Sequence, residues 1–177
     1  MALTVLDEQA KRIAAALGAC RIAAVIPCYR VRNQVEAVIA GIGPGVQRIY
    51  CVDDGCPEHT GKHIQENVKD PRVVVLFHKK NGGVGASVKT GYAAALGEGM
   101  DIVLKIDGDG QMDGSKIAEM VQPILLGQAD YVKGNRFFNL EDVKTMPKIR
   151  LIGNAGLSFL TKLSSGYWNI YDPSNGF

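Results

Sequence analysis

Short apolar runs alternate with amphipathic stretches along most of the chain. Runs rich in β-branched and other apolar residues predict five strands, at Arg21–Pro27, Ile49–Val52, Arg72–Phe77, Ile102–Ile106 and Tyr131–Lys133. Between them, apolar residues recur at helical spacing in Asn33–Ile42, His59–Val68, Ala86–Leu96 and Ser115–Leu126. Several strands are apolar throughout, which is typical of strands covered on both faces. The pattern therefore predicts an α/β fold, a doubly wound three-layer α/β/α sandwich with a mostly parallel sheet.

The two ends of the chain add helices to this series. An amphipathic helix is expected to end near Cys20, and helical spacing resumes at Ile149–Leu163 after an irregular polar stretch, Phe137–Pro147. No apolar run reaches the roughly 20 residues that a membrane-spanning helix needs. We expect one catalytic domain over residues 1–177, and we expect the chain to be the N-terminal part of a longer protein, because Asp172–Phe177 does not resemble a domain end.

Composition narrows the function only slightly. The 177 residues are 46% hydrophobic, enough to bury a sizeable core, and a net charge of +2 makes no case for a nucleic-acid partner. The four cysteines form no CxxC pair, so a reducing compartment, the cytoplasm, is the simpler expectation.

Polar and glycine residues gather where the predicted strands end. They are Pro27-Cys28-Tyr29, Asp53-Asp54-Gly55, Lys79-Lys80-Asn81-Gly82-Gly83, Asp107-Gly108-Asp109 and Gly134-Asn135-Arg136. In doubly wound sheets the ligand lies beyond the carboxyl ends of the strands. Five such loops on one edge therefore predict a single binding site.

The segment Asp107–Gln111 carries the strongest chemical signal. Asp107 and Asp109 are two hard oxygen ligands at the end of an apolar strand, and Gln111 offers a third oxygen, which together favour Mg²⁺ or Mn²⁺ on a diphosphate. An EF-hand counted from Asp107 would need glycine and glutamate where Met112 and Ala118 stand. A plain turn remains an alternative.

The other loops allow structural interpretations as well. Asp53 and Asp54 suit either a nucleobase or ribose, or the N-cap of the helix that follows. The glycines of Asn81–Ser87 fit neither the dinucleotide fingerprint nor the Walker loop, and we interpret them mainly as a tight strand-to-helix turn. Arg136 and Arg150 are candidates for gripping phosphate oxygens.

With these residues in order, the chain resembles the family 2 glycosyltransferases of the GT-A, nucleotide-diphospho-sugar transferase-like fold, and among them the dolichol-phosphate mannosyltransferase-like enzymes. The matching pieces span nearly the whole chain: Val25-Ile26-Pro27-Cys28-Tyr29, Val52-Asp53-Asp54-Gly55, Asp107-Gly108-Asp109-Gly110-Gln111, Gly134-Asn135-Arg136, Arg150 and Asp172-Pro173-Ser174-Asn175-Gly176-Phe177. Family members usually follow Pro-x-Tyr with Asn-Glu, where this chain has Arg30 and Val31, so UDP and GDP both remain open.

The resemblance implies a role for each matching position. Those placed at the nucleotide sugar are Pro27, Tyr29, Val52, Asp54 and Gly108, those at the metal are Asp107, Asp109 and Gln111, and those near the phosphates are Arg136 and Arg150. Asp172 belongs to a segment that resembles the stretch flanking the acceptor site. The candidate catalytic residues are thus Asp107, Asp109, Arg136 and Asp172.

The expected reaction is inverting transfer of a sugar from a UDP- or GDP-linked donor, with Mg²⁺ or Mn²⁺ at the leaving diphosphate. A polyprenyl phosphate acceptor needs no strong base, because its second pKa is about 6. A glycan hydroxyl would need a carboxylate base, for which Asp172 is a candidate. A lipid acceptor, or a C-terminal continuation, would bring the protein to the cytoplasmic face of a membrane.

Two rival functions remain. A sugar nucleotidyltransferase would normally carry a glycine-rich loop after the first strand, where this chain has Pro27-Cys28-Tyr29-Arg30. A non-catalytic nucleotide-sugar binding module would bind the donor without hydrolysing or transferring it.

Overall fold

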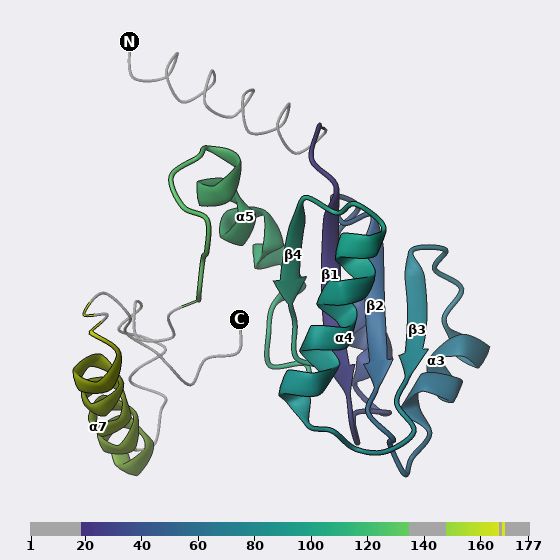
Figure 1. Ribbon diagram of the computed structural model, residues 1–177. Helices are drawn as coiled ribbons and strands as arrows, with labels where there is room; N and C mark the ends of the chain where they lie inside the picture. The colour runs from purple at the N-terminus through teal and green to yellow at the C-terminus, as the bar shows by residue number, and fades with distance from the viewer. Residues whose placement is uncertain (1–18, 135–147, 167, 169–177) are drawn as a thin grey trace. The chain divides into compact units, whose positions relative to one another are not determined.

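The chain divides into two compact units, Met1–Val132 and Lys133–Phe177. The computed structural model describes residues 19–134, 148–166 and 168 (Figure 1). The first unit contains a parallel sheet with its covering helices, and the second contains helix α7, Lys148–Ser165. The predicted N-terminal helix lies outside the described residues up to position 18.

Among the described residues, four strands form the sheet, and all of them are parallel. They are β1 (Ile22–Cys28), β2 (Arg48–Asp53), β3 (Val73–Phe77) and β4 (Ile102–Lys105), in the spatial order β3-β2-β1-β4. Val25 of β1 pairs with Tyr50 of β2 on one side and with Lys105 of β4 on the other. All seven residues of β1 are buried, which explains why its sequence is an uninterrupted apolar run. From β1, the next two strands are added on one side of the sheet, and β4 is then added on the other side of β1. Doubly wound folds bind ligands at the point where the strand order switches in this way.

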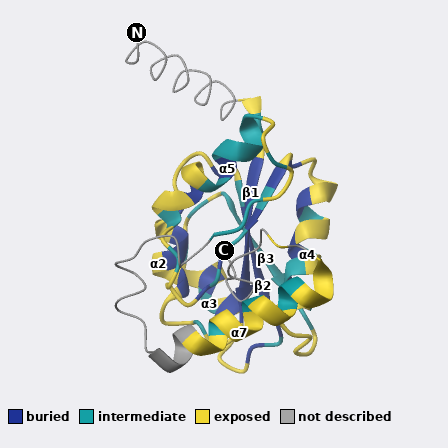
Figure 2. Cartoon of the chain, turned by 90° about the vertical axis from the view of Figure 1, so that its left-hand side faces the viewer, coloured by how far each residue is buried: buried dark blue, intermediate teal, exposed yellow. Residues whose placement is uncertain are grey.

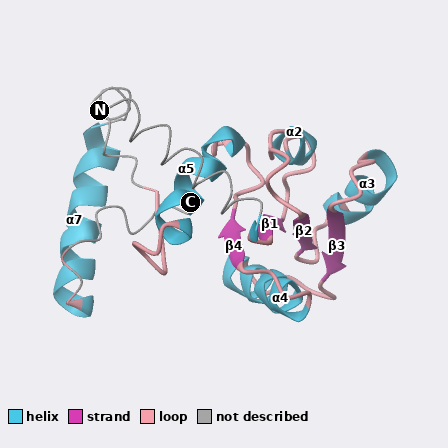
Figure 3. Ribbon diagram, turned by 90° about the horizontal axis from the view of Figure 1, so that it is seen from above, coloured by secondary structure: helices cyan, strands magenta, loops and turns pink. Residues whose placement is uncertain are grey.

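Helices cover both faces of the sheet. They are α2 (Val35–Ala40), α3 (Thr60–Asn67), α4 (Val84–Gly97) and α5 (Ile117–Leu125), and α5 follows a short 3-10 turn, Gly114–Lys116. Helix α4 lies on one face, with α2 and α3 on the other (Figure 3). This arrangement confirms the predicted three-layer sandwich, and the four helices lie within a few residues of their expected positions.

The core lies between the sheet and its helices, where the buried residues concentrate (Figure 2). On the α4 face, Val25 and Tyr50 pack with Ala95 and Met100. Helix α4 approaches β1 so closely that a Cβ added at Gly91 would lie 2.3 Å from Cγ1 of Val25. Glycine at this position therefore sets how near α4 lies to the sheet.

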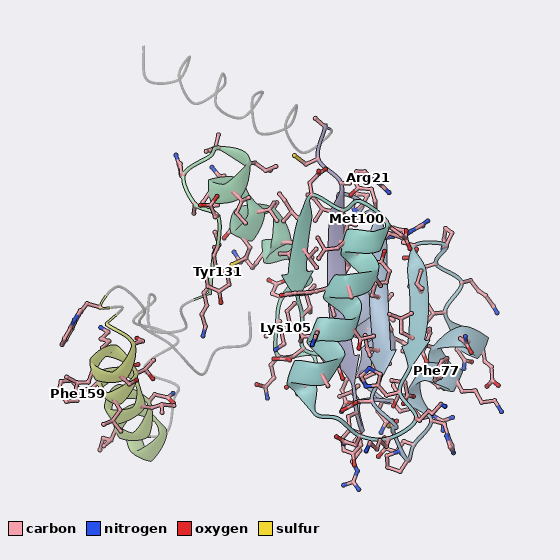
Figure 4. All side chains as sticks on the ribbon, viewed as in Figure 1. Arg21, Phe77, Met100, Lys105, Tyr131 and Phe159 are labelled. Carbon is pink, nitrogen blue, oxygen red and sulfur yellow. The ribbon has the colours of Figure 1, made fainter. Side chains whose placement is uncertain are left out.

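The segment Tyr131–Lys133 is not a strand, so the prediction of a fifth strand here was wrong. The Tyr131 side chain is 75% exposed, and no described residue forms a strand pair with this segment (Figure 4). Three residues with a solvated tyrosine bury too little apolar surface to offset the entropy of ordering an isolated strand.

Helix α7 matches the predicted Ile149–Leu163 with one to two additional residues at each end. No helix among the described residues has both the length and the hydropathy needed to cross a bilayer.

Candidate active site

A cavity lies beyond the carboxyl ends of the central strands, at the edge where the sequence predicts a binding site. Its lining residues come from the end of β1, the loops that follow the four strands and the first turn of α4: Pro27, Cys28, Tyr29, Val31, Asp54, Asn81, Gly83, Val84, Ser87, Asp107, Gly108 and Asp109. The cavity volume is about 210 Å³. Pockets that enclose a whole small molecule typically measure about 300–1,000 Å³, so this cavity suits one part of a larger ligand.

The first wall follows β1 and is shaped by a left-handed turn. Arg30 has φ of 57°, and its backbone N–H donates to Sγ of Cys56 at 3.1 Å. The Arg30 guanidinium lies 5.5 Å from the centre of the Tyr29 ring, which is 39% exposed. The turn thus places a partly exposed aromatic ring beside Pro27 in the cavity wall, where a planar group could stack on it.

Although the N-cap position itself is occupied by His59, Asp53 holds the start of α3 from the end of β2. Its Oδ1 accepts the N–H of Cys56 at 2.7 Å, and its Oδ2 accepts the N–H of Gly61, in the first turn of α3, at 2.6 Å. Asp53 does not line the cavity. Its carboxylate is used to begin a helix.

Asp54, the next residue, is buried in the cavity wall and connects two loops. Its Oδ1 accepts the N–H of Gly82 at 2.9 Å and its Oδ2 that of Gly83 at 2.7 Å. Nδ1 of His78 donates to Oδ1 at 2.6 Å, and Nε2 of His78 lies 2.8 Å from Oγ1 of Thr90. Burial by itself would raise the pKa of Asp54, but the hydrogen bonds from Gly82, His78 and Gly83 outweigh it, and the pKa is lowered. Asp54 is therefore an ionised anchor for the loop after β3.

The loop that Asp54 anchors also lines the cavity. Gly83 has φ of 84° and ψ of 167°, a conformation open essentially to glycine alone, and it precedes α4 directly. Asn81, Val84 and Ser87 contribute to the cavity wall together with Gly83. The sequence indicated a tight turn here. The structure shows that this turn is also part of the site.

The part of the cavity wall that follows β4 contains both candidate metal ligands. Asp107 and Asp109 line the cavity, as does Gly108, where a Cβ would lie 3.0 Å from Cγ2 of Val31. Oδ1 of Asp109 accepts the N–H of Gln111 at 3.0 Å, so the Gln111 backbone holds this carboxylate in place. Gln111 itself does not line the cavity.

Sequence reasoning missed two residues that contact carboxylates of the cavity wall. Lys105, the last residue of β4, forms an ion pair with Oδ1 of Asp107, and its side chain is only 16% exposed (Figure 4). Residues two positions apart in an extended chain lie on the same side, and this spacing was the available signal. His78 was also missed, although it directly follows β3 and so lies at the same sheet edge.

The carboxylates fit a divalent cation whose shell is completed by a ligand. Within the described residues, no cluster of three or more His, Cys, Asp or Glu side chains could hold a metal. Mg²⁺, however, is usually bound through one or two carboxylates plus substrate phosphates and water. Each carboxylate retains acceptor capacity beyond the single contact to its Oδ1. The donor set of Asp107 and Asp109 is therefore suited to a cation that a phosphate group shares.

The remaining predicted site residues are placed as follows. Val52 does not line the cavity, because its side chain is fully buried in the core on the α4 side. Arg136 and Asp172 lie outside the described residues. Arg150 belongs to α7, and its side chain is likewise outside the described part.

Comparison with known proteins identifies relatives along most of the chain. A family model described as "Glycosyl transferase family 2" matches residues 23–177. The chain is 32% identical, over 166 residues, to the UDP-N-acetylglucosamine–dolichyl-phosphate N-acetylglucosaminyltransferase of Methanococcus voltae, covering 86% of this chain and 66% of that protein. It is 25% identical, over 119 residues, to the undecaprenyl-phosphate mannosyltransferase of Micrococcus luteus, covering 66% of this chain and 48% of that protein.

Solved structures show a similar fold. Glucosyl-3-phosphoglycerate synthase from Mycobacterium tuberculosis superposes with a TM-score of 0.65 at 20% identity, covering 93% of this chain and 58% of that chain. The same enzyme in complex with Mn²⁺, UDP-glucose and phosphoglyceric acid gives a TM-score of 0.62 at 16% identity, over 93% and 57% of the two chains. The chain thus spans about half to two thirds of the length of these proteins.

Proposed function

Because the chain belongs to the family 2 glycosyltransferases, we propose that it carries the donor site of an enzyme that transfers a sugar from a nucleotide diphosphate to a polyprenyl phosphate. The transfer inverts the anomeric carbon and depends on Mg²⁺ or Mn²⁺. The observation that carries this proposal is the single cavity that joins Pro27 and Tyr29 to Asp107 and Asp109.

The donor is a UDP-sugar in this proposal, with GDP-sugars as the alternative. The Methanococcus voltae relative is named for UDP-N-acetylglucosamine, and the Mycobacterium tuberculosis enzyme is solved with UDP-glucose. The partly exposed ring of Tyr29 suits stacking on the base, and the cavity is large enough for part of the nucleotide.

Asp107 and Asp109 would hold the divalent cation, and Arg136 and Arg150 would bind phosphate oxygens. When bound, the cation neutralises the charge that builds on the departing nucleoside diphosphate. The chain's own residues orient this end of the donor: Asp54 fixes the loop of Gly82 and Gly83, and Gln111 fixes the carboxylate of Asp109.

The acceptor in this proposal is a lipid phosphate. One of its phosphate oxygens bonds to the anomeric carbon while the bond from that carbon to the diphosphate oxygen breaks, and the nucleoside diphosphate leaves. Such a phosphate is largely ionised at neutral pH, so the chain needs no strong general base. The names of the two sequence relatives, which contain dolichyl phosphate and undecaprenyl phosphate, support this acceptor class. With a lipid acceptor, the reaction would take place at the cytoplasmic face of a membrane.

The acceptor is tested with the full-length protein, a panel of UDP- and GDP-sugars and a polyprenyl phosphate. We expect the sugar of one nucleotide series to appear in the lipid fraction, with release of the nucleoside diphosphate. Transfer only to free glycans would reject the lipid acceptor and direct attention to Asp172 as a base. Donor binding with neither hydrolysis nor transfer would instead favour the non-catalytic binding module.

The metal assignment is tested by binding, with two acidic positions compared. Asp109→Ala should abolish the Mn²⁺-dependent part of nucleotide binding measured by calorimetry. Glu119→Ala is the matched control, because Glu119 is an exposed carboxylate that pairs with Lys116 outside the cavity. Wild-type nucleotide binding by Asp109→Ala with Mn²⁺ present would refute the metal assignment.

A further inference from the structure

The ion pair between Lys105 and Asp107 places a cation directly on a carboxylate that the proposed function assigns to the metal. Lys105 ends β4 beside Val25, and its ammonium group reaches Oδ1 of Asp107. The Lys105 side chain is 16% exposed and that of Asp107 34%, so both charges are partly withdrawn from solvent. An ion pair in such a position is less screened than one on the open surface.

The charges of the cavity lining indicate the role of the ion pair between Lys105 and Asp107. Among the lining residues there are three carboxylates, those of Asp54, Asp107 and Asp109, and no lysine or arginine. Asp54 is satisfied by His78 and two backbone N–H groups, and Asp109 accepts one backbone N–H. Among the described residues, Lys105 is thus the cation that balances a carboxylate placed to bind metal.

A divalent cation on Asp107 would lie within a few ångströms of the Lys105 ammonium group. Like charges at that separation in a partly desolvated site repel strongly, and the cation must also compete for an oxygen that Lys105 already contacts. The carboxylates of this chain alone should therefore bind Mg²⁺ or Mn²⁺ weakly.

A donor diphosphate changes this balance. It brings negative charge and oxygen ligands to the same place, so it can coordinate the cation and accept a hydrogen bond from the lysine at once. The lysine side chain is flexible and carries three donor hydrogens, so it can move from Asp107 to a phosphate oxygen without a change in the backbone.

We propose that Lys105 is a built-in counter-ion of Asp107 that makes cation binding depend on the donor diphosphate. This inference rests on the proposed function. In the absence of donor, Lys105 occupies Asp107. In its presence, the cation and the nucleotide bind together, each raising the affinity of the other by the same factor.

The experiment measures Mn²⁺ binding directly, by the electron paramagnetic resonance signal of free Mn²⁺, in the full-length protein with and without UDP or GDP. The variants are Lys105→Met, which removes the charge, and Lys105→Arg, which keeps it. Lys116→Met is the control, because Lys116 pairs with Glu119 outside the cavity. Circular dichroism and urea unfolding establish that each variant is folded.

In the wild type, the nucleotide should raise the Mn²⁺ affinity by about tenfold or more. Lys105→Met should bind Mn²⁺ alone about tenfold more tightly than the wild type, with the coupling to nucleotide reduced towards one. Lys105→Arg and Lys116→Met should behave as the wild type. This pattern distinguishes a counter-ion from a structural lysine, whose loss would weaken Mn²⁺ binding or leave it unchanged.

Unchanged Mn²⁺ affinity and coupling in Lys105→Met would overturn the inference while leaving the proposed function intact. Wild-type protein that binds nucleotide but no Mn²⁺ would overturn both the inference and the metal requirement. Absence of UDP and GDP binding altogether would overturn the proposed function, and the inference with it.

Discussion

Replacing Asp54 with alanine tests whether one buried carboxylate holds the cavity wall together. The substitution removes the acceptor for the N–H groups of Gly82 and Gly83 and for Nδ1 of His78. A hydrogen bond to a charged group contributes about 1.5–3 kcal/mol to stability when its donor is buried. Gly82 and Gly83 are exposed, so water can replace part of what they lose.

We therefore assign about 0.5–1 kcal/mol to each glycine N–H and about 1.5 kcal/mol to the partly buried His78. The free energy of unfolding should fall by about 3 kcal/mol, which corresponds to a decrease in Tm of about 10 °C for a unit of this size. Nucleotide binding should weaken as well, because the released loop includes the cavity residues Asn81 and Gly83.

The loss is measured by urea unfolding followed by far-UV circular dichroism. Asp109→Ala is the matched control, because it removes an exposed carboxylate from the same cavity. Within the part of the chain that the structure describes, this carboxylate accepts a single N–H, so the change should stay within about 0.5 kcal/mol. A loss below about 1 kcal/mol for Asp54→Ala would refute the anchoring role.

Three further predictions use the same unfolding assay. Gly91→Ala should destabilise the protein by about 1–3 kcal/mol through its clash with Val25, despite a helix-propensity gain of about 1 kcal/mol. Gly97→Ala, at a position with open space on the same helix, should not destabilise it. Equal effects of the two substitutions would contradict the close approach of α4. Arg30→Asn should stabilise by about 0.5–1 kcal/mol, because asparagine tolerates a left-handed backbone better than arginine, and a loss would show that the Arg30 side chain matters more than its backbone. The stability difference between the wild type and Asp54→Ala should be present at about pH 5 and shrink as the pH falls below about 4. The pKa of Asp54 is lowered in the folded protein, so its contribution is present above its unfolded pKa of about 3.9 and is lost in acid. A difference that grows in acid would reverse the assigned shift.

The sheet could be predicted because its strands are local patterns. Each confirmed strand is a run of apolar residues long enough to be recognised without knowledge of its neighbours. Tyr131–Lys133 lacked that length, and its classification depended on a pairing partner that the sequence cannot show.

The roles of Asp53 and Asp54 show where prediction from sequence ended. The partners of Asp53 are 3 and 8 positions away, close enough for the sequence to indicate a role at the start of the next helix. The partners of Asp54 lie 24 to 29 positions away, at the end of another strand and in the loop after it. The spacing of a single sequence carries no record of such distant contacts, although it did indicate that both loops end at the same sheet edge.

The strand order has a consequence for how the site forms as the chain folds. A hydrogen bond between Ile22 and Gln47 joins positions 25 apart, whereas the one between Arg21 and Asp101, at the start of β4, closes a loop of 80 positions. Because longer loops cost more entropy to close, β1 and β2 should associate before β4 joins them. In synthesis, β4 also leaves the ribosome after the other three strands that the structure describes. The aromatic half of the cavity would then exist before its carboxylate half. A nucleotide that needs both halves binds only the completed sheet, so it should slow hydrogen exchange most at the amides of β4.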